Sequence, residues 1–388
     1  MSKWPMVRLG DMASVLSGST PSTSVDKYWN GEYMWVTPAE LCDENVYIFE
    51  TARKITDEAI KNTNLKLLPV GTVLLSSRAP IGKVAITGVE MYCNQGFKNL
   101  ICSHKLYNKY LFYFLKKNLP YLQSLGRGAT FKEISKPIVE SIFVPLPPLE
   151  TQKKIADILD KAKSLIDLRK KQIEKMDLLI KSKFIEMFGD PVTNPKGWKV
   201  KPLKSICFKL TDGTHFSPES YSKGDYKYIT AKNIKRYGFD LESITYVPKD
   251  IHNMIYKRCN PEYGDILYIK DGVTTGVALI NTLTEEFSML SSVALLKHNR
   301  NLIVNYYLRD LLNNNQMYKT IRGKMGGAAI TRLTITKLNG LAIPVPPLHI
   351  QQQYSFAVES VEKQKYLLQQ ALEKMEINYK SLMQEYFG

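Results

Sequence analysis

The sequence has no hydrophobic run that could span a membrane and very little cysteine. No apolar stretch approaches the ~18–20 residues that a membrane-spanning helix needs. The first residues contain no apolar segment of the kind that directs export, so we expect a cytoplasmic protein. The five cysteines are scattered, and none forms a Cys-x-x-Cys pair. Reduced thiols are therefore expected, with neither a disulfide framework nor a zinc site.

The usual signatures of catalysis and of metal or nucleotide binding are also missing. The sequence contains no Gly-x-x-x-x-Gly-Lys-Ser/Thr phosphate loop and no His-Glu-x-x-His zinc motif. Its five histidines lack the spacing of metal ligands. We therefore expect no catalytic residue, no bound metal and no cofactor in this chain.

Positive charge is what the chain has in excess. Lys and Arg total 53 against 37 Asp and Glu, a formal net charge of +16. Such an excess attracts polyanions, and nucleic acid is the commonest polyanion available to a cytoplasmic protein. A basic enzyme without a polyanionic partner is the alternative at this point, because net charge bears on partners and not on fold.

The chain of 388 residues repeats itself at about half its length. Pro-Leu-Pro-Pro-Leu at 145–149 recurs as Pro-Val-Pro-Pro-Leu at 344–348, and Phe188-Gly189 recurs as Phe387-Gly388. Internal repetition of this kind fixes the architecture before any element is assigned. We expect a first globular domain at 1–148, a long segment at 149–189, a second globular domain at 190–347 and a second long segment at 348–388.

The two long segments have the residues that typically mark where helices begin and end. Each begins just after a double proline, contains no internal proline or glycine, and ends in Phe-Gly. Proline is favoured at a helix start but not inside a helix, and glycine is favoured just after a helix end. The sequence therefore predicts two uninterrupted helices.

A stripe of apolar residues, spaced alternately by four and three positions, runs along each predicted helix. A sustained 3.5-residue period predicts a coiled coil, although two ordinary core helices are the alternative. About 38 residues would make a rod of roughly 57 Å. The first helix leads from one globular domain to the other, so a second helix that packs on it must run back. We expect an antiparallel pair with one globular domain at each end. The stripe positions are Ile155, Leu159, Ile166, Ile173, Met176 and Ile180 in the first helix, and Val358, Leu368, Leu372, Met375 and Leu382 in the second.

The globular domains have a mixed α and β pattern. In the first, residues 71–76 and 83–87 are predicted strands and residues 107–119 a predicted helix. The second shows the same order, with strands near 265–270, 277–281 and 293–297 and a helix near 303–322. The expected fold class is α+β, with two pseudo-repeated mixed α/β domains separated by two long antiparallel helices.

The loops between these elements are rich in the side chains that read base edges and hold phosphates. A plain turn or a packing aromatic is the alternative at each position. In the first domain the candidate DNA contacts are Thr20, Thr23, Lys27, Tyr28, Trp29, Arg78, Lys83, Asn94, Gln95, Lys98 and Arg127. In the second they are Thr214, His215, Lys232, Asn233, Lys270, Thr274, Thr275 and Lys324.

Taken together, the layout resembles the specificity subunit of type I restriction–modification systems over essentially the whole chain. The most specific marks are the repeated Pro-x-Pro-Pro-Leu followed by Gln152 or Gln351, and the Phe-Gly helix ends. The first domain is similar to the family's target-recognition domains through GSTPST, YWNGEYMWVTPAEL, SSRAPIGKVAI and CNQGFKNL, and the second through DGTHFSPE and YKYITAKNI. The second lacks the Arg-Ala-Pro and Asn-Gln-Gly-Phe tracts, so the two are expected to read different sequences.

The resemblance implies a DNA-recognition subunit without catalysis of its own. Each globular domain would read one half of a split, asymmetric target in double-stranded DNA. The helices would set the spacing between the halves and dock two modification subunits that methylate adenine with S-adenosylmethionine. Restriction subunits, helicase–nucleases that use ATP and Mg, would cleave unmethylated DNA, and no membrane partner is implied. A coiled-coil adaptor or general nucleic-acid-binding protein without such partners is the alternative.

Overall fold

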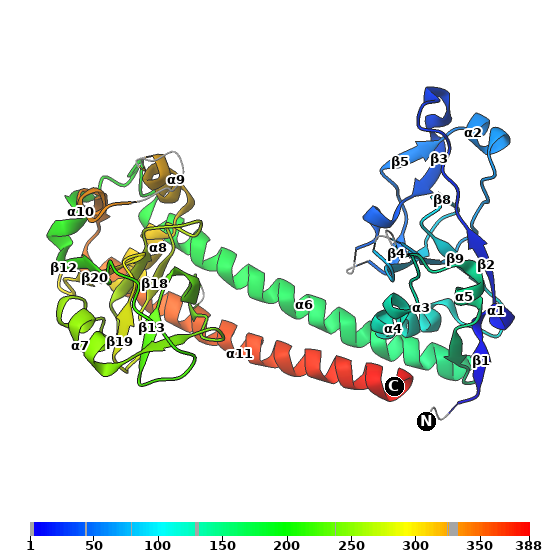
Figure 1. The fold of residues 1–388 in the computed structure, drawn as a ribbon. Helices are drawn as coiled ribbons and strands as arrows, with labels where there is room; N and C mark the ends of the chain where they lie inside the picture. Colours follow the sequence, from blue (N-terminus) through cyan, green and yellow to red (C-terminus); the bar gives the residue numbers. More distant parts are fainter. Residues whose placement is uncertain are drawn as a thin grey trace. The chain divides into compact units, whose positions relative to one another are not determined.

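The computed structural model describes residues 4–42, 45–78, 80–128, 132–236, 238–323, 325 and 333–388. The chain divides into two compact units (Figure 1), one formed by Met1–Lys170 with Ala371–Gly388 and the other by Lys171–Gln370. Each unit therefore contains the beginning of one long helix and the end of the other.

The first unit is built on a five-stranded sheet in the order β2-β9-β6-β7-β4 and a three-stranded sheet in the order β5-β3-β8. Neighbouring strands are antiparallel except for the β4–β7 and β3–β8 pairs, which are parallel. β6 and β7 are buried along their whole length and are rich in β-branched residues, as central strands usually are. The two sheets contain β2 (Ala13–Ser17), β3 (Trp29–Val36), β4 (Tyr47–Ile48), β5 (Arg53–Ile55), β6 (Val73–Leu75), β7 (Val84–Thr87), β8 (Tyr92–Cys93) and β9 (Lys98–Cys102).

Short helices and a two-stranded ribbon complete the first unit. The ribbon pairs β1 (Met6–Arg8) with β10 (Phe143–Pro145), and α3 (Asn108–Lys117) buries Tyr110, Leu111 and Phe114 among other residues. α3 stops where Pro120 enters the first turn of the next helix, because proline cannot continue a helix. The remaining helical segments are α1 (Leu9–Met12), η1 (Asp26–Tyr28), η2 (Pro38–Glu40), α2 (Asp57–Asn62), α4 (Leu119–Ser124) and α5 (Lys136–Glu140).

The second unit repeats this plan. Its main sheet has the order β12-β20-β17-β18, and its three-stranded sheet has the order β16-β13-β19. The strands, including the ribbons β11–β21 and β14–β15, are β11 (Lys199–Pro202), β12 (Cys207–Asp212), β13 (Tyr226–Ile229), β14 (Ile234–Lys235), β15 (Gly238–Phe239), β16 (Thr245–Val247), β17 (Ile266–Ile269), β18 (Ala278–Ile280), β19 (Phe287–Met289), β20 (Val293–His298) and β21 (Ala342–Val345). The short helices are η3 (Leu203–Ile206), η4 (Ala231–Asn233), α7 (Lys249–Arg258), α8 (Asn305–Leu312), α9 (Asn315–Gly323) and α10 (Ile335–Asn339).

Matching hydrogen bonds show that the two units are structural repeats. The Tyr110 hydroxyl donates to the Pro145 carbonyl at 2.8 Å, and the Tyr307 hydroxyl donates to the Pro344 carbonyl at the same distance. The two tyrosines lie on matching helices, Tyr110 on α3 and Tyr307 on α8. The predicted fold class of two mixed α/β repeats with two long helices is confirmed.

One helix that the sequence predicts as continuous is interrupted in the structure. The single helix expected near 303–322 is two helices, α8 and α9, separated at Asn313 and Asn314. The Asn313 side chain bonds both the N–H and the carbonyl of Ala278, and Asn314 Oδ1 accepts the Gln316 N–H at 2.8 Å. Asparagine side chains compete in this way with helical backbone bonds, which the apolar spacing does not reveal.

The long helices are α6 (Leu149–Phe188) and α11 (Leu348–Phe387), each 40 residues without interruption. Gly189 follows α6 with a φ of +78°, the left-handed conformation expected after a helix end. Every predicted stripe position on both helices is buried or partly buried. The coiled-coil spacing therefore identified the packed faces of both helices.

Within each unit, the two helices run antiparallel. In the first unit, Lys170 of α6 pairs with Glu376 of α11 at 2.8 Å, whereas Phe387 packs on Tyr110 near the start of α6. In the second unit, Asp177 pairs with Lys365 of α11. The ring of Phe188, at the end of α6, lies 5.2 Å from the ring of Tyr354, near the start of α11. The order of contacts along the helices is reversed in both cases.

Gln152 and Gln351, which follow the repeated proline motif, are fully buried and fasten each long helix to its unit. Each amide oxygen accepts one backbone N–H, and each amide nitrogen donates to two carbonyls. The partners are backbone groups of Lys105, Tyr107 and Pro147 for Gln152, at 2.8–2.9 Å, and of Leu302, Val304 and Pro346 for Gln351, at 2.7–3.1 Å. One buried side chain thus satisfies three backbone groups, which explains physically why the motif includes glutamine.

Replacing Gln351 with leucine should destabilise the second unit strongly. The substitution keeps a similar volume but removes the hydrogen-bond partners of three backbone groups, at a cost of about 3 kcal/mol or more. The measurement is the free energy of unfolding of the full chain in urea. Gln353→Leu, on an exposed position of the same helix, is the matched control and should change it by less than about 0.5 kcal/mol. Equal behaviour of the two variants would contradict the role given to Gln351.

Candidate nucleic-acid interface

Three loops of the first unit are joined to one another where their strands end. We call them the first loop face: Gly18–Thr23 after β2, the β6–β7 loop of residues 76–78 and 80–83, and the β8–β9 loop of residues 94–97. The Ser19 N–H donates to the Cys93 carbonyl at 3.0 Å, and the Ser77 N–H donates to the Gly96 carbonyl at 2.7 Å. A Cβ added to Gly18 would lie 1.9 Å from the Asn94 carbonyl oxygen, so only glycine permits this close approach.

The second unit builds the same arrangement, which we call the second loop face. It comprises residues 213–218 after β12, the β17–β18 loop of residues 270–276 and the β19–β20 loop of residues 290–292. Thr214 N–H donates to the Met289 carbonyl at 2.8 Å, and Lys270 N–H donates to the Ser292 carbonyl at 2.9 Å. A Cβ on Gly213 would lie 2.0 Å from the Met289 carbonyl oxygen. The internal repeat therefore extends to the candidate site.

The structure gathers most of the predicted contacts of the first domain on the first loop face. The Thr20 hydroxyl donates to Gln95 Oε1, and Lys83 Nζ donates to the Pro38 carbonyl at 3.1 Å. Arg127 comes from outside the three loops and lies beside Arg78, because both pair in isolated β-bridges with Glu133. The predicted residues placed on this face or beside it are Thr20, Thr23, Arg78, Lys83, Asn94, Gln95, Lys98 and Arg127.

Lys27, Tyr28 and Trp29 lie outside the three loops. Lys27 forms an ion pair with Glu58, and Trp29 is buried in a small second core around Trp35. The indole N–H of Trp29 donates to the Ser22 carbonyl, and that of Trp35 donates to the Ser19 carbonyl, both at 3.1 Å. The two tryptophans therefore hold the Gly18–Thr23 loop in place.

On the second loop face, His215 and Thr274 are exposed, whereas Thr214, Thr275 and Lys270 are buried. Lys232 and Asn233 lie on η4, which joins the face through the Ala231 N–H and the Ser292 hydroxyl, 3.3 Å apart. Lys232 is exposed, and Asn233 is buried with its side chain bonded to Thr230 and to the Asp240 carbonyl. Lys324 falls outside the described residues.

Two of the predicted DNA-contacting lysines are buried ion-pair partners. Lys98 Nζ lies 2.9 Å from Glu133 Oε1 and 3.3 Å from Ser77 Oγ, with 8% of its side chain exposed. Lys270 Nζ lies 2.9 Å from Asp271 and 3.4 Å from Asp212, with the same exposed fraction. Their charges are already compensated inside the protein. We expect both lysines, like buried Trp29, Thr214, Asn233 and Thr275, to position the faces rather than to reach DNA.

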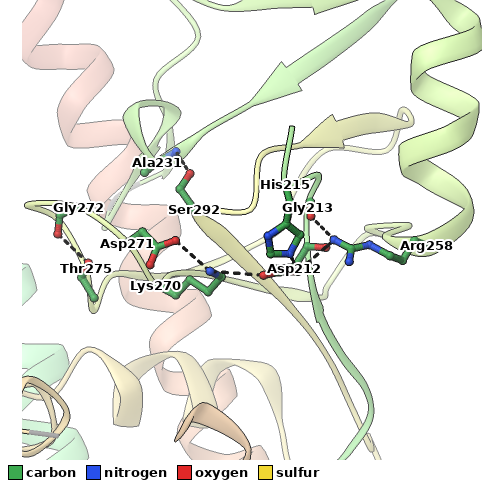
Figure 2. A network of polar contacts seen from close by, with 10 residues as sticks. All are labelled: Asp212, Gly213, His215, Ala231, Arg258, Lys270, Asp271, Gly272, Thr275 and Ser292. Carbon is green, nitrogen blue, oxygen red and sulfur yellow. Dashed lines mark hydrogen bonds and ion pairs between the residues drawn. The ribbon is translucent and has the colours of Figure 1, made fainter. Parts of the chain in front are cut away.

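Asp212 is the centre of the polar network of the second loop face (Figure 2). Its carboxylate accepts from Arg258 Nη2 at 3.1 Å, lies 3.1 Å from His215 Nε2 and pairs with Lys270. Arg258 also donates to the backbone carbonyls of Asp212 and Gly213. The Asp212 side chain is 6% exposed, but those of His215 and Arg258 are 65% and 51% exposed. One buried carboxylate thus holds an arginine and a histidine side chain, both of which remain largely exposed.

Arg258 was missed by sequence reasoning. It lies in the last turn of α7, 46 positions from Asp212, and no local motif marks it. Only the packing of α7 beside the β12 loop brings the guanidinium to the loop face. The combination of exposed Arg, His, Lys, Gln and Thr side chains on a fixed backbone can donate to base edges and phosphates.

Neither a reactive thiol nor a cluster of metal ligands lies at the loop faces among the described residues. Burial raises the pKa of Cys93, beside the first loop face, and of Cys259, beside Arg258, to about 12 each. Both thiols are therefore protonated at neutral pH and are poor nucleophiles. In the described ranges, no three His, Cys, Asp or Glu side chains cluster as metal ligands. Nor does this part of the chain contain a helix long and apolar enough to cross a membrane.

The comparisons with known proteins agree with this arrangement. The chain matches the family described as the type I restriction modification DNA specificity domain twice, over residues 1–177 and 195–377. The MjaIX type I restriction enzyme specificity subunit of Methanocaldococcus jannaschii is 30% identical and is matched over 92% of this chain and 86% of its own length. The MjaVIII subunit of the same organism is 25% identical over 98% of this chain and 91% of its own.

A solved structure supports the fold independently. The crystal structure of the type I restriction–modification S subunit from M. genitalium superposes with a TM-score of 0.61. The alignment covers 100% of this chain and 96% of that chain at 15% identity. At such low identity, the likeness supports the shared fold alone.

Replacing Lys232 with alanine should weaken DNA binding without destabilising the protein. Its ammonium group is exposed beside the second loop face, so its loss should reduce the slope of log affinity against log salt by about one. The measurement is fluorescence anisotropy with duplex DNA at several salt concentrations. Lys204→Ala, on η3 before the opposite end of β12, removes the same charge and should leave the slope nearly unchanged. Equal slopes for the two variants would place the DNA elsewhere.

Proposed function

The chain belongs to the type I restriction modification DNA specificity family, and from this premise we propose that it selects the DNA sequence on which a type I restriction–modification complex acts. Each unit reads one half of a bipartite target in double-stranded DNA. The observation that carries this proposal is the construction of the same loop face twice in one chain. Backbone bonds fix both faces in the same way, while the side chains on them differ.

The differences between the faces favour an asymmetric target. Ser77 and Lys270 occupy matching positions, because each donates its N–H to the loop that follows β8 or β19. Gly18 and Gly213 also match, which makes Ser17 the counterpart of Asp212. The acidic centre that holds Arg258 and His215 in the second unit is therefore replaced by serine in the first. Different donors and acceptors on the two faces recognise different base edges.

The net charge of +16 supplies the part of the affinity that does not depend on sequence. Each phosphate neutralised by a lysine or arginine releases counterions, so binding weakens steeply as salt rises. The alternative of a general nucleic-acid-binding protein or coiled-coil adaptor is not favoured, because the family match covers both units.

We assign the long helices two roles, the spacing of the half-sites and the docking of two modification subunits. Both helices are uninterrupted and each belongs to both units. Apolar side chains that face away from the packed stripe remain exposed, which supports a docking role. They include Ile158, Leu165 and Leu168 of α6 in the first unit and Phe356, Tyr366 and Leu367 of α11 in the second.

In this proposal, the partner subunits carry out catalysis. The chain contributes recognition, and the modification subunits methylate adenine with S-adenosylmethionine. Restriction subunits use ATP and Mg to cleave DNA that is not methylated. We propose that the complex acts in the cytoplasm.

Exchanging one globular domain tests whether each unit reads one half of the DNA target. We expect that replacing residues 1–148 with the corresponding domain of another specificity subunit, and keeping both helices, changes one half of the methylated motif. The other half should stay the same, because the second loop face is intact. The measurement is methylation sequencing of DNA from cells that express the chimera with the modification subunits. The reciprocal exchange of 190–347 is the control and should change the other half. A motif left unchanged by either exchange would contradict the proposal.

A further inference from the structure

Arg53 lies on an aromatic platform in the first unit. Its guanidinium carbon is 3.7 Å from the centre of the Trp29 ring and 5.4 Å from that of Trp35. The two indoles meet edge to face, with ring centres 5.0 Å apart and an angle of 78° between their planes. Both tryptophans are nearly fully buried, whereas Arg53 is exposed. A planar cation therefore lies over the face of a buried indole at the surface.

The backbone around Arg53 is fixed as well. Arg53 pairs with Trp35 across β5 and β3, and its carbonyl accepts the Thr51 hydroxyl at 2.7 Å. Glu40 accepts the N–H of Ala52 at 2.7 Å. The backbone from which the side chain starts is thus fixed, and the contact with Trp29 restricts the guanidinium further, which lowers the entropy lost on binding.

The guanidinium of Arg53 makes no hydrogen bond or ion pair within the described part of the chain. Three acidic side chains on neighbouring elements are engaged elsewhere. Glu40 is bonded to the backbone N–H groups of Thr37 and Ala52, Asp57 accepts the Tyr33 hydroxyl, and Glu58 pairs with Lys27. A positive group with five N–H donors and no internal acceptor is available for an external ligand.

The platform is joined directly to the first loop face. Trp29 and Trp35, on which Arg53 lies, donate their indole N–H groups to the Ser22 and Ser19 carbonyls. Those two residues belong to the Gly18–Thr23 loop. DNA that contacts this loop would therefore pass close to Arg53.

The described part of the second unit has no such platform. The Val36–Cys93 and Ile229–Met289 pairs correspond, because Cys93 and Met289 accept the matching loop bonds. Tyr228 then takes the place of Trp35, and its cross-strand partner is Thr245 instead of Arg53. A feature needed only for folding would be expected in both repeats, whereas a feature that reads a particular base belongs to one.

We propose that Arg53 is a specificity-determining residue of the first unit and that its guanidinium donates to O6 and N7 of a guanine in the half-site read by that unit. This inference rests on the proposed function. A guanidinium held over an indole face can present two N–H donors to the two acceptors on the guanine edge, and arginine is the side chain that most often makes this contact. A phosphate could be bound by any mobile cation and would not need the tryptophan wall.

The test compares Arg53→Lys, Arg53→Ala and Lys54→Ala in the full chain assembled with its modification subunits. Lys54 is the next residue of β5 and its side chain points to the opposite side of the strand, so it controls for loss of charge. Both Arg53 variants should reduce discrimination for guanine at one position of the first half-site by roughly tenfold or more. The second half-site and the thermal unfolding midpoint should be unchanged. The measurement is methylation of a duplex library randomised over both half-sites.

Three results would overturn the inference. A uniform loss of affinity across all sequences, with the motif intact, would make Arg53 a phosphate contact. A motif change caused equally by Lys54→Ala would make the effect one of charge alone. Unchanged methylation by all variants would leave Arg53 with only a structural role. Failure of the domain exchange to alter either half-site would instead refute the proposed function itself, so the two failures are distinguishable.

Discussion

Each globular unit completes its hydrophobic core with the end of a helix that begins in the other unit. In the first unit, Met383 and Phe387 of α11 join the core that contains Tyr110. In the second, Phe184 and Phe188 of α6 pack with Tyr307 and Tyr354. Burying each of these side chains contributes roughly 1.5–3 kcal/mol, so neither core is complete without both helices. The two helices that connect the recognition units therefore also complete their hydrophobic cores, so each unit needs this connection in order to fold.

The two loop faces show how one backbone framework can support different recognition. Glycine at 18 and 213 allows the same close approach of loops, and matching N–H groups join them. A buried lysine stabilises each face, yet it comes from β9 as Lys98 in the first unit and from the residue after β17 as Lys270 in the second. The carboxylate partners differ as well. Side chains on the faces can thus vary while the framework that presents them is kept.

Much of this organisation could be predicted from the sequence because it depends on local spacing. The repeated proline motif, the absence of helix breakers and the 3.5-residue period are properties of neighbouring residues, and they correctly indicated α6 and α11. The period did not include Phe184 and Phe188, because the helix ends dock into globular cores, where a straight helix of 3.6 residues per turn drifts from a heptad stripe. The burial of Lys98 and Lys270, and the positions of Arg53 and Arg258 beside the faces, depend on contacts between distant segments. No single-sequence pattern contains those contacts.

The half-site spacing tests the central claim most directly. Seven residues inserted after Lys171, with seven more after Gln370, add two turns to both helices and keep the apolar stripes in register. Each helix becomes longer by about 10 Å, which corresponds to roughly three base pairs of DNA. The account predicts that the methylated motif keeps both half-sites and gains a spacer longer by about that amount. An unchanged spacer, with methylation retained, would contradict it.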